Sequence, residues 1–125
     1  MSVRPSAEDE QLVLPGTADL WEGEGAPPAL GPDAIAALLA GPLPRLHTVR
    51  MPLHGLGPEA ARALARCALP ALVHLDLRGN ALGADGVRAL IEGFPALAVL
   101  DVRHNGLTPD ERRALAATFD GMLLA

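Results

Sequence analysis

The chain contains no lysine and no tyrosine, and it has only one cysteine, one tryptophan and two phenylalanines among 125 residues. The shortage of aromatic rings predicts a core of Leu, Ala and Val side chains within a single folded domain. The lone cysteine, Cys67, excludes an intramolecular disulfide, which agrees with a reducing cytoplasm.

Long apolar runs are also missing from the sequence. No stretch approaches the roughly 18 apolar residues that a membrane-spanning helix needs. Residues 1–16 lack the basic segment followed by an apolar segment that marks a secretion signal. These two absences predict a cytoplasmic protein without a membrane partner.

An excess of positive charge is absent as well, because the net charge is −5. Residues 1–25 contain six acidic residues and one arginine, whereas residues 26–125 contain nine acidic residues and nine arginines. A neutral body without a basic stripe disfavours nucleic acid and anionic lipid as partners. We expect residues 1–19 to form an acidic, flexible leader and residues 20–125 to form the folded domain.

One apolar pattern occurs three times, at intervals of 26 and 25 residues. The three copies read Leu46-x-x-Val49-x-Met51-x-x-His54-x-Leu56, Leu72-x-x-Leu75-x-Leu77-x-x-Asn80-x-Leu82 and Leu97-x-x-Leu100-x-Val102-x-x-Asn105-x-Leu107. This spacing is the signature of a leucine-rich repeat. For a lone unit of this length, the entropy cost of ordering the chain exceeds the stabilisation from burying its core side chains. We therefore expect the units to fold only as a stack.

Each unit combines a strand with a helix. Apolar and polar residues alternate around Leu75 and Leu77, which predicts a short strand with one buried face. Helix starts follow at Gly57-Pro58-Glu59, Gly83-Ala84-Asp85 and Thr108-Pro109-Asp110. Asn80 and Asn105 lie where the chain leaves each strand. We expect their side-chain amides to hydrogen-bond backbone groups of the turn.

A degenerate unit precedes these three, because residues 30–38 repeat the helix pattern of residues 56–64. Its strand has two alternatives. Either residues 20–28 are the strand half and form an irregular cap, with Trp21 covering the end of the core, or Leu12-Val13-Leu14 is the strand and residues 15–28 are an insertion. We divide the domain into a degenerate unit at 20–45 and three units at 46–71, 72–96 and 97–125.

The run from Leu72 to Leu90, including Asn80, Gly83 and Gly86, resembles the ribonuclease-inhibitor-like class of leucine-rich repeats. Residues 107–121 look like the closing unit of bacterial members, and a chain whose ten basic residues are all arginine agrees with that source. The resemblance implies a right-handed α/β solenoid with parallel strands on a concave face and helices on a convex face. It also implies a role in protein recognition and supplies no catalytic motif. Pro52 departs from the pattern and predicts a short or bent strand.

The outward positions of the strands are the candidate binding residues. Across three units they are Thr48, Arg50 and Pro52, then His74, Asp76 and Arg78, then Val99, Asp101 and Arg103. We select the six polar ones for partner binding on the concave face: Arg50, His74, Asp76, Arg78, Asp101 and Arg103. Asp76 and Asp101 should be neighbours, as in an acid/base pair, although mutual neutralisation by Arg78 and Arg103 accounts for the same pattern.

Other chemistry finds little support in the sequence. The four histidines lack the spacing of a metal site, and no nucleophile motif or phosphate loop is present. We therefore expect no cofactor, no metal and no small-molecule substrate. The favoured function is a non-catalytic module that binds an unidentified protein. The alternatives are a structural, self-assembling stack and, third, an enzyme that uses Asp76 and Asp101.

Overall fold

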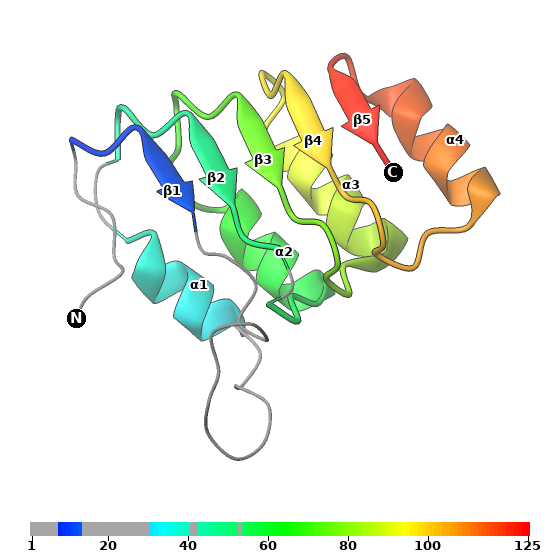
Figure 1. The fold of residues 1–125 in the computed structure, drawn as a ribbon, viewed down its shortest axis with the longest axis horizontal. Helices are drawn as coiled ribbons and strands as arrows, with labels where there is room; N and C mark the ends of the chain where they lie inside the picture. Colours follow the sequence, from blue (N-terminus) through cyan, green and yellow to red (C-terminus); the bar gives the residue numbers. More distant parts are fainter. Residues whose placement is uncertain (1–7, 14–30, 41–42, 53) are drawn as a thin grey trace.

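The computed structural model describes residues 8–13, 31–40, 43–52 and 54–125. Strands and helices alternate in it: β1 (Gln11–Val13), α1 (Pro32–Leu38), β2 (Thr48–Arg50), α2 (Pro58–Ala65), β3 (His74–Asp76), α3 (Gly83–Gly93), β4 (Val99–Asp101), α4 (Pro109–Thr118) and β5 (Met122–Leu124). All strands are parallel and lie in chain order in one sheet, with the helices along one side of it (Figure 1). The α/β solenoid expected from the sequence is confirmed.

The core lies between the sheet and the helices. The central residue of each strand points into it, and Val49, Leu75 and Leu100 are fully buried there. Leu64 of α2 and Leu90 of α3 fill the same layer from the helix side. Each such side chain contributes about 1.5 to 3 kcal/mol when it leaves water, so the aliphatic core predicted from the scarcity of rings is the principal source of stability.

The helix starts predicted from the sequence are confirmed. Pro32, Pro58 and Pro109 each begin a helix, at a position where the missing N–H of proline costs no hydrogen bond. In α4 the Thr108 side chain accepts from the Glu111 amide at 3.1 Å while the Glu111 carboxylate accepts from the Thr108 amide at 2.9 Å. This reciprocal capping box fixes the start of the last helix.

The packing of α3 on α2 depends on two glycines. A Cβ at Gly93 would lie 2.7 Å from the Cβ of Ala65, and a Cβ at Gly86 would lie 3.3 Å from the Cβ of Ala61. Hydrogen in place of a side chain therefore lets the two helices approach closely.

The first strand, β1, lies before residue 20, where we expected the degenerate first unit to begin. β1 pairs with β2 so that Leu12 lies opposite Val49, and Leu12 is 6% exposed. Of the two alternatives, the structure thus has the strand around Leu12 and Val13, inside residues 1–19. Residues 20–28 and Trp21 lie outside the described residues, and the remaining domain boundaries stay predictions.

The fifth strand, β5, is not foreseen in the sequence pattern. Leu123 occupies the position of Leu100, but Asp120 stands where the pattern has Leu97. The neighbouring Phe119, 8% exposed, fills that part of the core instead. Gly121 brings the chain close to β4, since a Cβ there would lie 2.6 Å from the carbonyl oxygens of Leu97 and Ala98.

The strands are shorter than the apolar pattern indicates. Each has three residues, so Pro52, Arg78 and Arg103 lie in the turns that follow the strands rather than within them. β2, which precedes Pro52, is no shorter than the others. Of the helices in the described part of the chain, none combines the length and hydropathy that crossing a bilayer requires.

Candidate functional site

The face of the sheet opposite the helices carries two rows of side chains, because the parallel strands pair in register. The first row is Gln11, Thr48, His74, Val99 and Met122, and the second is Val13, Arg50, Asp76, Asp101 and Leu124. Pro52, Arg78 and Arg103 follow directly in the turns. We call these residues together the open face. It brings together all six residues that the sequence analysis selected.

Aspartates and arginines in the middle of the open face neutralise one another. Arg78 Nε donates to Asp76 Oδ1 at 3.0 Å and lies 3.6 Å from Asp101 Oδ2, which joins two consecutive units. Arg103 holds Asp101 with both guanidinium ends, through Nε at 2.9 Å and Nη2 at 2.7 Å. The backbone amides of Arg78 and Arg103 donate to the same two carboxylates.

The electrostatics of Asp101 follow from these bonds. Burial of its carboxyl group by itself raises the pKa, but the side-chain and backbone hydrogen bonds from Arg103 oppose that effect, together with the charge of Arg78. The net result is a pKa below the usual aspartate value. In turn, the hydrogen bond to Asp101 raises the pKa of the Arg103 guanidinium.

This pairing leaves little scope for an acid/base dyad. Asp76 and Asp101 do lie opposite each other in the register, as the sequence predicts. However, both carboxylates are 4 to 6% exposed and accept hydrogen bonds from arginine. A dyad that shares a proton needs two carboxylates facing each other without such neutralisation. Among the described residues, no group of three His, Cys, Asp or Glu side chains is placed to hold a metal ion.

Arg50 differs from the other two arginines of the open face. It lies opposite Asp76 in the register and is exposed, yet no hydrogen bond or ion pair within the described residues reaches its guanidinium. Its neighbour Thr48 is buried and bonds the Nδ1 atom of His47 at 2.8 Å. Arg50 therefore offers a positive charge that no side chain of the described residues compensates.

Apolar side chains lie at both ends of the open face, and the repeat pattern does not predict them. Met122 is 59% exposed and lies beside Val99, while Leu124 is partly exposed beside Asp101. At the opposite edge Val13 is 51% exposed beside Arg50. Only the recognition of β1 and β5 as strands could have revealed them.

Asn80 and Asn105 have the structural role predicted for them. The Asn80 carbonyl oxygen accepts from the amides of His54 and Leu56 at 2.9 and 3.1 Å, and its amide donates to the Leu77 carbonyl at 2.9 Å. One unit later, the Asn105 carbonyl oxygen accepts from the Leu82 amide at 3.1 Å, and its amide donates to the carbonyls of Leu77 and Val102 at 2.9 and 3.0 Å. Both side chains are buried with their polar atoms satisfied, so they are not free to bind a ligand.

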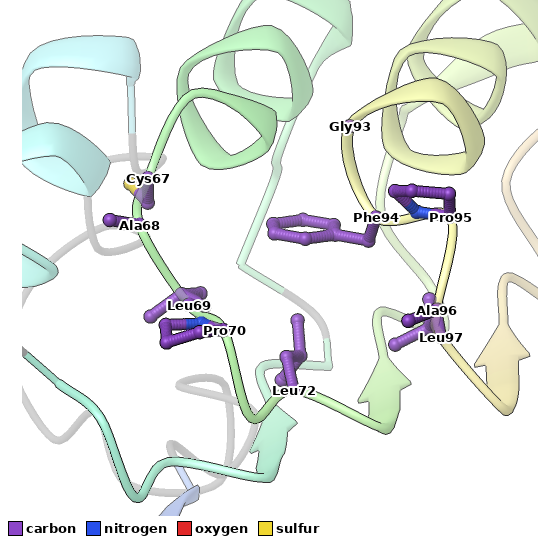
Figure 2. A pocket seen from close by; sticks show the side chains of 10 residues that line it. All are labelled: Cys67, Ala68, Leu69, Pro70, Leu72, Gly93, Phe94, Pro95, Ala96 and Leu97. Carbon is purple, nitrogen blue, oxygen red and sulfur yellow. The ribbon is translucent and has the colours of Figure 1, made fainter.

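A second candidate is an apolar hollow of about 340 Å³ at the edge of the solenoid (Figure 2). It opens between the chain that follows α2 and the chain that follows α3. The lining comprises Cys67, Ala68, Leu69, Pro70, Leu72, Gly93, Phe94, Pro95, Ala96 and Leu97. The only ionisable side chain among its lining residues is the Cys67 thiol, whose pKa is raised by burial. The hollow therefore has no charged group that could orient a ligand or take part in catalysis.

Comparison with known proteins agrees with the repeat pattern. The family model for the leucine-rich repeat matches residues 69–90, which run from the chain after α2 through β3 into α3. A search of curated proteins found no match to this chain.

Proposed function

We propose that this chain is a non-catalytic protein-binding module and that the partner contacts the open face. The leucine-rich repeat at residues 69–90 supports the general role, because such repeats commonly mediate protein–protein interaction and are usually non-catalytic. The observation that carries the proposal is the open face itself, where polar and apolar side chains lie on the side of the sheet opposite helices α1 to α4.

We also propose the finer identity suggested by the sequence. A helix in every unit and repeats of 25 to 26 residues favour the ribonuclease-inhibitor-like subclass. The arginine-only basic residues favour a bacterial source, and the single cysteine favours the cytoplasm.

The size of the open face limits the affinity. Five strands about 4.8 Å apart, with two rows of side chains, present only a few hundred Å², against about 800 Å² per partner in a standard interface. Binding by the open face alone is therefore weak, and neighbouring loops contribute to any tight complex.

A pair of charge reversals tests the proposal on a partner identified by affinity capture. Reversal at Arg78 or Arg103 would remove the cation that neutralises a buried aspartate. We therefore choose Arg50→Glu, because the Arg50 guanidinium makes no hydrogen bond or ion pair within the described residues. The control is Arg62→Glu, on α2 at the helix face. We expect Arg50→Glu to weaken binding about tenfold in calorimetry, with an unchanged unfolding midpoint. If only Arg62→Glu weakens binding, the partner contacts the helices and not the open face.

End-to-end assembly is the second candidate function. β5 is the last strand of the sheet in the described residues, and Met122 on it is 59% exposed. An unpaired strand edge can pair with another chain. Sedimentation over a concentration series tests this function, since assembly predicts a mass that rises with concentration and that Met122→Asp reduces to the monomer. A constant monomer mass would remove this candidate.

A further inference from the structure

We propose that the open face binds an extended peptide segment of the partner protein that carries an acidic residue and a large apolar residue four positions apart. This inference rests on the proposed function and specifies the chemistry of the partner. It follows from an uneven distribution of charge and apolar surface across the second row of the open face.

The acidic residue is assigned to Arg50, the second position of this row, which lies next to Val13 of β1. The open face has three arginines and two aspartates, and Arg78 and Arg103 are already bonded to Asp76 and Asp101. The remaining positive charge is thus located on Arg50, which is exposed. A carboxylate that meets it gains a charge-assisted hydrogen bond without displacing a partner among the residues that the structure describes.

The apolar residue is assigned to the β5 end of the row. Leu124 stands there, with Met122 beside it in the first row and Val99 on the adjoining strand. Met122 is among the most exposed large apolar side chains in the described residues, at 59%. An apolar side chain resting on this group removes area from water on both partners, and the flexible Met side chain adapts to its shape.

The distance between Arg50 and Leu124 sets the spacing. Arg50, Asp76, Asp101 and Leu124 are paired in register, so they lie in one line that crosses three strand intervals. At about 4.8 Å per interval these two residues are about 14 Å apart, which an extended chain at about 3.4 Å per residue covers in four residues. Residues four apart in an extended chain also point to the same side.

An extended segment fits this surface better than a helix. The two rows extend about 7 Å along the strands, whereas a helix with its side chains is about 10 to 12 Å wide. A helix would also need about nine residues to cover the same 14 Å. The residue midway along an extended segment lies over the neutralised aspartates and arginines, where a small polar side chain can hydrogen-bond.

The test uses synthetic peptides and the full chain labelled with ¹⁵N. The first peptide is acetyl-Gly-Glu-Gly-Ser-Gly-Leu-Gly-amide. Three comparison peptides carry Lys in place of Glu, or place Glu and Leu two residues apart, or place them nine apart in an alanine-based helix. We expect the first peptide to shift the amide signals of Arg50 and Leu124 and to bind about fivefold more tightly than each comparison peptide.

A charge exchange provides the decisive control. In the Arg50→Glu variant the preference should reverse, so that the Lys peptide binds about fivefold more tightly than the Glu peptide. Equal affinity of the Glu and Lys peptides for the unsubstituted chain, or no measurable binding of either, would overturn the inferred partner chemistry. Tighter binding of the alanine-based helical peptide, in which Glu and Leu are nine residues apart, would overturn the inferred extended conformation.

These failures differ from a failure of the proposed function. If the captured partner loses affinity with Arg50→Glu but the peptides do not discriminate, the open face remains the binding surface and only the inferred segment is wrong. If the captured partner is insensitive to Arg50→Glu, the proposed function fails first, and the peptide assignment fails with it.

Discussion

The side-chain amide of Asn80 donates to the carbonyl oxygen of Met51, 29 residues earlier in the chain, at 3.0 Å. Asn105 repeats this bond to Leu77 at 2.9 Å. Each asparagine thus joins the turn of its own unit to the end of the strand in the preceding unit. The stack is held together by buried polar contacts as well as by the aliphatic core, because both asparagines are buried, where a hydrogen bond is stronger than in water.

We predict that Asn80→Ala destabilises the fold by about 1 to 3 kcal/mol, because it leaves the amides of His54 and Leu56 without their acceptor. Urea unfolding followed by circular dichroism measures this loss. The control is Asp85→Ala, which removes only a surface ion pair with Arg88 and should cost less than about 0.5 kcal/mol. A midpoint for Asn80→Ala equal to that of the unsubstituted chain would contradict the structural role of this asparagine.

We predict that Leu12→Ala destabilises the fold by about 2 to 4 kcal/mol, because Leu12 fills the core beside Val49. The matched control is Val13→Ala, at a position 51% exposed, which should change the stability by less than about 0.5 kcal/mol. Thermal unfolding of the two variants compares them. Equal small effects would mean that residues 11–13 are not part of the sheet in solution.

We predict that His104→Gly stabilises the fold by about 0.5 kcal/mol, because His104 has a φ of 61° and this left-handed conformation strains a residue with a Cβ. The preceding unit has Gly79 at the corresponding place, with a φ of 68°. The reciprocal change, Gly79→Ala, should therefore destabilise by about 1 kcal/mol. Chemical denaturation of both variants tests the pair, and the prediction fails if the two changes act in the same direction.

We predict that the stability contributed by Asp101 is lost in acid. Its pKa is lower in the folded chain than its usual value of 3.8, so its contribution is complete above about pH 4 and disappears as the pH falls through the folded pKa. Urea unfolding between pH 7 and pH 2 should show a shallower fall for Asp101→Asn than for the unsubstituted chain. Asp85→Asn, on the exposed face of α3, should retain the original slope. Identical slopes for all three proteins would refute the assignment.

Charged residues of the open face illustrate how far the candidate site follows from the sequence. The repeat register alone predicts that Asp76 lies beside Asp101 and that Arg78 and Arg103 stand one step further on, because parallel strands of equal units pair position by position. The sequence gives neutralisation by Arg78 and Arg103 as one interpretation of this pattern, beside an acid/base pair, and does not decide between the two. Only side-chain packing shows that Arg78 and Arg103 turn onto the aspartates and that Arg50 does not.

By itself, the sequence determined the repeat, the order of strand and helix and the role of the asparagines. Leu75, Leu77 and Asn80 recur at fixed spacing because each unit must present the same face to its neighbours. The tertiary structure alone decided the two end strands. Around Leu12 and Leu123 the runs are too short for any periodicity, and an end strand lacks a neighbour on one side, so it needs fewer of the repeated core residues. Pairing with β2 and β4 supplies the hydrogen bonds that make these residues strands, and it thereby brings Met122 and Leu124 onto the open face.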